Sequence, residues 1–373
     1  ISDCLVGSEM CIRDRIYDIQ GRKQNKSMLN DRYRAGRRAH IILTFTLLLV
    51  SGFSLAIGPA DVSIWSILKK LMLNELLTSL EYIIIFDIRL PRLLLGTCVG
   101  AALAISGAVM QGLFRNPLAD PGLIGISAGA GLGAIIAIVL GGIIPGFIAS
   151  ILGNYLVVFF AFLGGWATTL ILYSVATRRG QTSVATMLLA GIALGALAGA
   201  ISGILVYKAD DQQLRDLTFW GLGSLAGASW AKVTVAGPLI GIAILFAARL
   251  GQGLNALALG EATAAHIGVA TQNLKNKAIF TVAAATGIAV AVSGGIGFIG
   301  IVVPHLVRQL IGPDHRTLIL NSGLLGAIIL VLADVISRII VAPAELPIGI
   351  ITAVIGAPVF LWILLSNRRE GNW

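Results

Sequence analysis

The polar side chains whose types and spacing could support chemistry stand in short blocks between long apolar runs. The longest such block in the C-terminal half spans residues 249–277. Its pattern predicts two short helices that break at Gly260, with Glu261 at the start of the second, where the helix dipole stabilises an anion. Gly268 then supplies a helix stop. Such a pair could transmit a push from a soluble partner, whereas an ordinary loop would absorb it, and spacing alone leaves both interpretations open.

A second polar block, RNPLADPG at residues 115–122, interrupts the chain between two apolar runs. Its prolines and Gly122 indicate a tight turn. We assign Asn116 and Leu118 a role at the mouth of a transport pathway, because they would lie where that turn meets the ends of two apolar helices.

Asp334 and Arg338 are one helical turn apart in an apolar segment, where charges are costly and are usually paired. A mutual ion pair is at least as well supported as a transport role for Asp334. Glu345 would lie at a helix entry, where it could act as a cap. His305 follows Pro304 in an apolar setting, and packing or a backbone hydrogen bond explains it better than ligand binding.

Several signatures of catalysis are absent from the sequence. It contains no GxxxxGK[ST] loop, no HExxH motif, no CxxC pair and no clustered pair of acids. The glycine-rich stretch at residues 293–300 lies between apolar runs rather than after a strand, so close helix packing explains it better than nucleotide binding. We therefore predict a chain that is not an enzyme, with no catalytic residue, no metal site and no permanently bound cofactor.

The elements that must position these residues are membrane helices. The chain of 373 residues is 57% hydrophobic and 12% charged, with a mean hydropathy of +0.90, which predicts an all-α polytopic membrane protein. Its 45 glycines suit helices that approach closely in lipid, and no barrel-like alternation is present. The net charge of +9 needs no nucleic acid to explain it, because nine of the 27 Lys and Arg residues lie between Arg13 and Arg38.

The apolar runs predict ten membrane spans. The eighth run has only twelve residues, fewer than the roughly 20 that cross the hydrocarbon, so we expect it to pack inside the bundle or to be re-entrant. The runs cover residues 40–57, 93–111, 124–140, 147–175, 186–206, 233–248, 278–292, 300–311, 318–341 and 348–365.

The charge distribution sets the predicted orientation. Ten spans place both termini on one side, and that side carries eighteen Lys and Arg residues against seven on the other, which favours cytoplasmic termini. The predicted external loops are then residues 58–92 and 207–232. The chain divides into a basic tail at 1–39, whose first fifteen residues look foreign, a ten-span transmembrane domain at 40–366 with short cytoplasmic helices near 252–271, and a cytoplasmic tail at 367–373.

Four blocks, at residues 89–131, 257–269, 297–308 and 333–364, closely resemble the permease subunits of bacterial ABC importers for iron-siderophores, haem and cobalamin. The resemblance covers nearly the whole chain after residue 40. It implies the ten-helix type II importer fold in the bacterial inner membrane, a homodimer around a central pathway, two cytoplasmic ATP-binding subunits that hydrolyse ATP, and a binding protein that docks on the external side.

The resemblance also implies roles for single residues. Arg89, Arg92 and Arg338 match external arginines that pair with acids on the binding protein. Asn116 and Leu118 match the cytoplasmic gate, and a second gate falls near residues 181–185 without a fixed register. The coupling helices that seat in the ATPase match Leu257, Leu259, Gly260, Glu261, His266 and Gly268.

The stretches at residues 209–230 and 114–127 resemble haem permeases more than cobalamin or siderophore permeases, so haem is the predicted substrate, with a ferric siderophore or cobalamin as the alternative. None of the four histidines is a convincing haem ligand. An ion-coupled secondary transporter would need paired intramembrane acids, and only Asp334 is a candidate. A membrane-embedded enzyme would need a clustered catalytic set, which the sequence lacks. An adjacent gene for an ATPase with a Walker motif would favour the importer.

Overall fold

The structure is a computed structural model that describes residues 34–58, 69–70, 72–73, 75, 77–178 and 181–369. The predicted basic tail before residue 34, with its foreign-looking start, and residues 370–373 lie outside the described residues. The described chain is helical apart from one small antiparallel hairpin, formed by β1 (Thr177–Arg178) and β2 (Gln181–Thr182). The all-α prediction is therefore confirmed.

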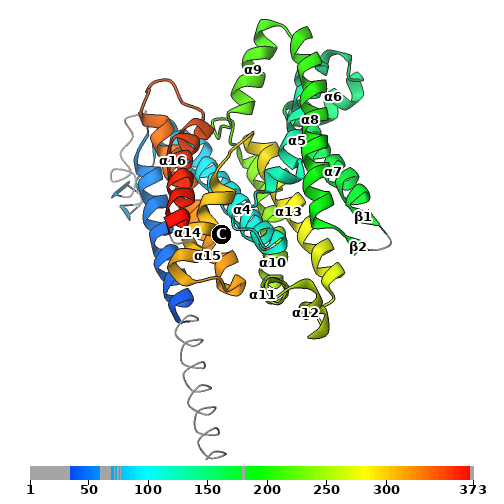
Figure 1. The fold of residues 1–373 in the computed structure, drawn as a ribbon. Coiled ribbons are helices and arrows are strands. Elements are labelled where there is room, and N and C mark those ends of the chain that lie inside the picture. Colours follow the sequence, from blue (N-terminus) through cyan, green and yellow to red (C-terminus); the bar gives the residue numbers. More distant parts are fainter. Residues whose placement is uncertain are drawn as a thin grey trace, which may run out of the picture.

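Among the described residues, ten apolar helices build the bundle (Figure 1). Eight are long and apolar enough to cross a membrane: Arg34–Ala56, Ser79–Phe114, Gly146–Ala176, Val184–Lys208 (α8), Trp230–Arg249 (α10), Thr271–Ser293 (α13), His315–Ile339 (α15) and Ile348–Leu365, the apolar part of α16 (Ile348–Arg369). Two are shorter: α5 (Ile126–Val139) and α14 (Ile299–Ile311). The short eighth segment was predicted, whereas the shortness of α5 was not.

The second membrane helix begins earlier than the sequence indicated. Residues 58–92 were predicted as an external loop, but a helix starts at Ser79 and continues through α3 (Ser79–Tyr82), the π-helical η1 (Ile83–Arg89) and α4 (Leu90–Phe114). Thr78 and Glu81 form a capping box at its start, which satisfies the first free N–H groups of the helix. Arg89 and Arg92 consequently lie within a helix and not in a loop.

Helix α4 is the centre of the bundle and contacts α10, α13, α14 and α15. Small residues make these contacts possible, because lipid supplies no hydrophobic drive for helix association and close packing must replace it. A Cβ atom on Gly107 would meet the backbone carbonyl of Gly300 in α14, and one on Gly100 would meet that of Gly326 in α15. Glycine at these positions lets three helices approach to backbone contact.

Two groups of helices flank this centre (Figure 1). On one side, α5 packs between α7 (Leu156–Ala176) and α8; on the other, α15 packs against α14 and α16. Helices α10 and α13 contact each other and α4, and α13 also reaches α7, so they join the two groups. Large apolar side chains left exposed on α8, α10 and α16 give the bundle the outer surface that a membrane helix presents to lipid.

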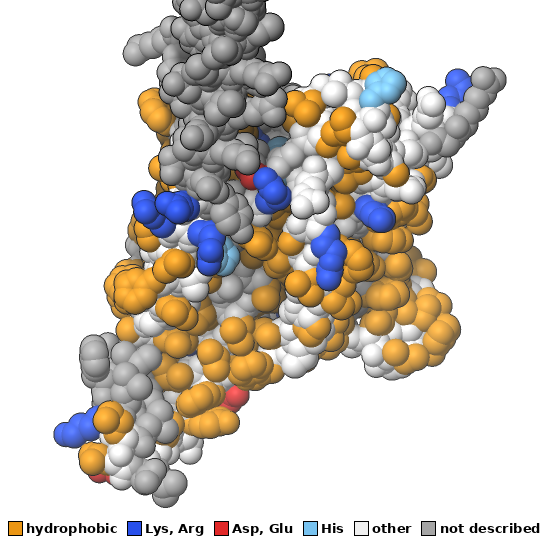
Figure 2. All heavy atoms as spheres, turned by 90° about the horizontal axis from the view of Figure 1, so that it is seen from below, with side chains coloured by type: hydrophobic (Ala, Val, Ile, Leu, Met, Phe, Trp, Pro, Cys, Tyr) orange, Lys and Arg blue, Asp and Glu red, His pale blue; other side chains and the backbone are white. Residues whose placement is uncertain are grey.

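The short elements lie at the two ends of the bundle. Helix α9 (Asp211–Gly221), capped by Asp210, lies at one end, and α11 (Gly251–Ala258) and α12 (Glu261–His266) lie at the other (Figure 1). The remaining short helices are η2 (Pro121–Ile124), η3 (Gly141–Ile143), α6 (Gly146–Leu152) and η4 (Gly153–Tyr155). The α11–α12 end carries Lys and Arg side chains over a largely hydrophobic surface (Figure 2).

Candidate functional site

The polar block at residues 249–277 forms the predicted pair of short helices, α11 and α12. They meet at Gly260, whose φ of +110° is a backbone conformation that side-chain-bearing residues rarely adopt. Gly268, with φ +89°, follows α12. The interpretation as an ordinary loop is therefore wrong, because both segments are hydrogen-bonded helices.

The predicted coupling residues divide into anchors and exposed positions. Leu257 is buried against the bundle core. Leu259 is 68% exposed and His266 is also exposed, so both are accessible on the end surface. The side chain of Glu261 is half-exposed. The α11–α12 pair is thus held to the bundle by a buried inner face. Its outer face presents the apolar side chain of Leu259 and the imidazole of His266.

Asn255 fastens α11 to the start of α15. Its side-chain amide donates to Oδ1 of Asp314 over 2.6 Å, and its carbonyl oxygen accepts from the backbone N–H of His315 over 2.9 Å. Partial burial raises the pKa of Asp314, but hydrogen bonds from Arg316 and Asn255 outweigh that effect and hold its pKa below the usual value. Asp314 is therefore charged at neutral pH, and α11 is held by a charge-assisted bond.

Lys275 connects α12 to the hairpin. Its Nζ atom lies 2.5 Å from Oε1 of Glu261 and donates to the carbonyl oxygen of Thr182 over 2.9 Å, and the lysine is 4% exposed. Gln272 adds two bonds to the same threonine: it accepts from the Thr182 N–H over 2.9 Å and donates to its hydroxyl over 2.6 Å. Lys275 and Gln272, near the start of α13, therefore connect α12 to β2.

Sequence reasoning missed Lys275 and Gln272 as site residues. Lys275 was counted only among the basic residues that set the orientation. Its partners could not be inferred because Glu261 is 14 positions away and Thr182 is 93 positions away. The available signal was a lysine in the first turns of a predicted membrane helix, where a buried ammonium group needs a partner.

The predicted gate residues lie in the turn between α4 and η2. Asn116 is exposed, and its side-chain oxygen accepts from the backbone N–H of Leu118 over 2.9 Å, which fixes the turn. Asp120 caps η2 by accepting from the N–H of Gly122 over 2.7 Å. Burial raises the pKa of Asp120, although the bond from Gly122 opposes the rise. The turn is rigid, and the gate role of Asn116 and Leu118 stays a prediction.

The three arginines assigned to docking by the resemblance are buried in this chain. Arg89, Arg92 and Arg338 are 4%, 5% and 4% exposed. Arg92 donates to Asp334 over 2.8 Å and to Glu345 over 2.9 Å. Guanidinium groups inside a bundle need partners within it, and the docking role of these three arginines stays a prediction.

Asp334 is the shared anion of this cluster. It lies 2.8 Å from Arg92 and 3.2 Å from Arg338, which confirms the predicted pair one helical turn apart. Arg338 also donates to the hydroxyl of Ser54 over 3.0 Å, and Arg89 donates to the carbonyl of Leu55 over 2.7 Å. Three helices, those at Arg34–Ala56, Ser79–Phe114 and α15, and the loop before α16 are thereby joined at the end opposite α11 and α12. An acid already paired with two cations is poorly suited to coupling ions in a secondary transporter.

Within the residues that the structure describes, no group of three or more His, Cys, Asp or Glu side chains could hold a metal ion. The described residues thus form a braced pair of short helices at one end, a buried ion cluster at the other, and the glycine-packed helix α4 between them.

Known proteins similar to this chain are importer permeases. The chain matches the FecCD transport family over residues 46–366. It is 43% identical over 330 residues to the hemin transport system permease protein HmuU of Yersinia pestis, covering 88% of this chain and 97% of the relative. It is 44% identical over 286 residues to the vitamin B12 import system permease protein BtuC of Citrobacter koseri, covering 76% of this chain and 84% of that one.

Solved structures give the same fold. An inward-facing metal-chelate type ABC transporter superposes with a TM-score of 0.78 at 32% identity, covering 88% of this chain and 99% of the other. PsaBC from Streptococcus pneumoniae superposes with a TM-score of 0.53 at 16% identity over 76% of this chain and 92% of that one, which supports the fold alone. The chain is an importer permease with the type II fold and a multi-pass protein of the bacterial inner membrane, and it belongs to the FecCD transport family.

Proposed function

We propose that this chain is the permease subunit of an ATP-driven haem importer. The observation that carries the choice of haem is the similarity to a hemin permease along 97% of that protein's length. The chain has no nucleotide loop of its own, so ATP is hydrolysed on a separate subunit and this chain is not catalytic.

Cobalamin is the second candidate substrate. The vitamin B12 permease of Citrobacter koseri is equally similar in identity, although it matches a shorter stretch of this chain. A ferric siderophore remains the third. All three are large metal chelates that would pass through a mainly apolar pathway without ligation.

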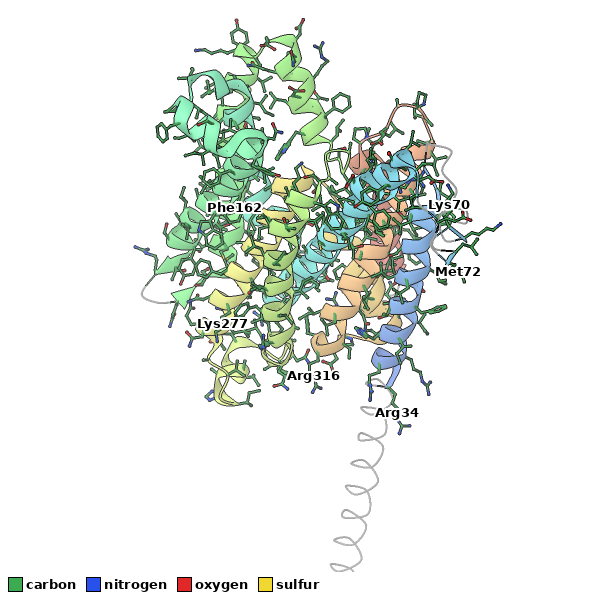
Figure 3. The ribbon with its side chains drawn as sticks, turned by 180° about the vertical axis from the view of Figure 1, so that it is seen from behind. Arg34, Lys70, Met72, Phe162, Lys277 and Arg316 are labelled. Atoms are coloured by element: carbon green, nitrogen blue, oxygen red, sulfur yellow. The ribbon has the colours of Figure 1, made fainter. Side chains whose placement is uncertain are left out.

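The proposed assembly is a homodimer with its twofold axis along the membrane normal, two ATP-binding subunits and an external binding protein. We place α11 and α12 on the cytoplasmic side, seated in the ATPase, with Leu259 and Glu261 at the contact. Two features support that placement: the excess of Lys and Arg on that side, and the bracing of both short helices through Asn255 and Lys275. Arg34, at the start of the described chain, lies at this same end (Figure 3).

We propose that movement of α12 reaches the hairpin through Lys275. The ammonium group bonds to Glu261 on one side and to Thr182 on the other, so a displacement of α12 pulls on β2 directly. Asn116 and Leu118 form the proposed cytoplasmic gate. At the opposite end, Arg89, Arg92 and Arg338 support the docking surface from within, because their buried charges fix the helix ends on which a binding protein would rest.

The test is reconstitution with the cognate ATPase and binding protein. Haem-loaded binding protein should stimulate ATP hydrolysis in proteoliposomes. Cobalamin and ferric siderophores should bind the binding protein weakly and should stimulate ATP hydrolysis little. Stimulation by cobalamin alone would replace haem with the second candidate. Failure of all three substrates, with a complete assembly present, would remove the importer assignment itself.

A further inference from the structure

An apolar groove runs along the face of the bundle opposite α8 and α16. It lies between α7, α10 and α13 and has a volume of about 970 Å³. Phe162 and Lys277 mark its two ends on this face (Figure 3). Its walls carry the aromatic rings of Trp166, Phe246 and Phe280. The groove borders α11 through Gln252 and Gly253, and none of the residues of the arginine cluster lines it.

The groove is about as long as one leaflet of a bilayer is thick. Leu239 and Arg249 both line it and are ten residues apart on α10, which corresponds to roughly 15 Å along a helix. The hydrocarbon core of a bilayer is about 30 Å thick. A smaller cavity of about 400 Å³ shares Leu239 and continues toward Lys232 at the other end of the bundle.

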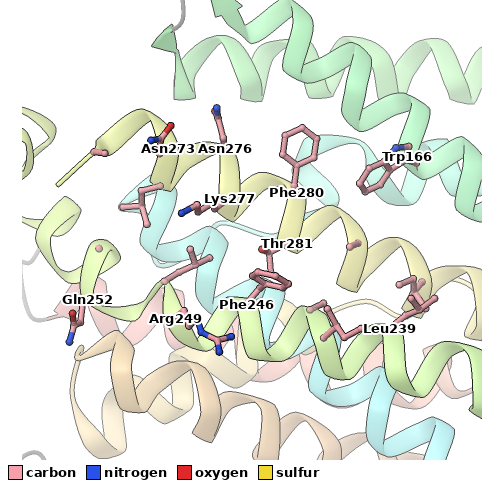
Figure 4. A pocket seen from close by; sticks show the side chains of 18 of the residues that line it. Trp166, Leu239, Phe246, Arg249, Gln252, Asn273, Asn276, Lys277, Phe280 and Thr281 are labelled. Carbon is pink, nitrogen blue, oxygen red and sulfur yellow. The ribbon is translucent and has the colours of Figure 1, made fainter.

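Polar groups gather at the α11–α12 end of the groove. Arg249 and Lys277 line it there, together with the amide side chains of Gln252, Asn273 and Asn276 (Figure 4). The rest of the lining toward Leu239 is apolar apart from Thr281. The groove thus has a cationic, hydrogen-bonding end and a hydrophobic body.

The two cations have no anion of their own. Both side chains are exposed, and among the described residues neither forms a salt bridge; Arg249 only donates to the carbonyl of Leu245 over 3.4 Å. No Asp or Glu stands among the described residues that line the groove. Two other basic side chains at this end are paired, Lys275 with Glu261 and Arg316 with Asp314.

We propose that this groove binds an anionic phospholipid of the leaflet on the α11–α12 side. The phosphate would accept hydrogen bonds from Arg249 and Lys277, with the amides of Gln252 and Asn273 near the glycerol oxygens. The acyl chains would lie along Trp166, Phe246 and Phe280. Basic pockets between membrane helices on the cytoplasmic side bind such headgroups, and a zwitterionic lipid would leave the two positive charges without a net counter-charge.

The experiment is native mass spectrometry of the purified protein from nanodiscs that contain equal amounts of phosphatidylglycerol and phosphatidylcholine. The wild-type protein should retain phosphatidylglycerol preferentially. The double variant Arg249→Gln with Lys277→Gln should reduce that preference by roughly 30-fold. Each cation near an anionic surface strengthens binding by roughly fivefold, and the two factors multiply. Ala284→Trp, which fills the groove without changing charge, should reduce retention of both lipids.

The matched control is Arg178→Gln, which removes an exposed cation at the same end of the bundle but outside the groove. It should leave the preference unchanged. Equal retention of the two lipids by the wild-type protein would overturn the proposal even if every variant failed to fold. An undiminished preference in the double variant, or an equal loss in the control, would overturn it as well.

Discussion

The Nζ atom of Lys275 lies 2.5 Å from Oε1 of Glu261, and the same atom donates to the carbonyl oxygen of Thr182 over 2.9 Å. This buried ammonium group bonds directly to both α12 and the hairpin. Movement of α12 would therefore be passed to the hairpin through the Nζ atom of Lys275. Glu261 both anchors α12 to α13 and presents a half-exposed charge at the surface.

Replacing Glu261 with Lys should uncouple transport from ATP hydrolysis or weaken ATPase assembly. The change reverses the charge at a helix start and sets two ammonium groups against each other where an ion pair stood. Substrate moved per ATP hydrolysed should fall at least about fivefold, the lower range of ordinary coupling free energies. Normal assembly together with normal substrate-stimulated ATPase activity would contradict this role.

A double-mutant cycle separates the brace from a direct ATPase contact. Glu261→Gln and Lys275→Gln should each reduce coupling, and the double variant should be no worse than the stronger single one, because both changes break the same interaction. Lys275→Gln retains a donor for Thr182. Strictly additive losses in uptake per ATP would show that Glu261 acts on the partner independently of Lys275.

Removal of the anion from the arginine cluster should destabilise the fold. Asp334→Ala leaves Arg92 and Arg338 buried without their shared partner, and such losses cost about 3–5 kcal/mol. The control is Glu345→Gln, whose partner pair is partly exposed and should matter by about 0.2–1 kcal/mol. Thermal unfolding of the detergent-solubilised protein measures both, and equal stability of the two variants would refute the stabilising role of Asp334.

Close approach of α4 and α14 gives a prediction about glycine. Gly107→Ala places a methyl group against the carbonyl of Gly300, and backbone cannot move aside as a side chain can, so a loss of about 1–3 kcal/mol is expected. Gly237→Ala, in α10 with open space around it, should be neutral or slightly stabilising. A neutral Gly107→Ala in the same unfolding measurement would mean that the helices are farther apart than described.

Much of the fold was predictable because membrane helices leave a strong signal. Each long apolar run became a helix, and the paired short helices followed from Gly260 and Glu261, whose local roles are fixed by backbone geometry and dipole. The start of the second span was missed because the capping box at Thr78 and the π-helical turn before Leu90 give no change in hydropathy.

The candidate site was less predictable because its contacts are long-range. The pairing of Asp334 with Arg338 follows from helical spacing, but its bond to Arg92 joins positions 242 residues apart. The same holds for Lys275 and Thr182. Local sequence shows that a buried charge needs a partner, and only the packing of distant helices shows which partner it finds.

The proposed dimer has its own test. The permease purified in nanodiscs should have the mass of two chains, since a pathway between two copies requires both. A single chain per nanodisc that still assembles with ATPase and supports uptake would contradict the homodimer. A single chain that is inactive would instead agree with the need for two copies.

The measurement that tests the central claim most directly is substrate uptake into proteoliposomes that contain this permease, its ATPase and external binding protein. Haem should accumulate inside only when ATP is present with the ATPase, and Glu261→Lys should abolish accumulation without preventing membrane insertion. Accumulation of cobalamin but not haem would contradict the proposed substrate, and haem accumulation that is independent of ATP and unchanged in Glu261→Lys would contradict the coupling itself.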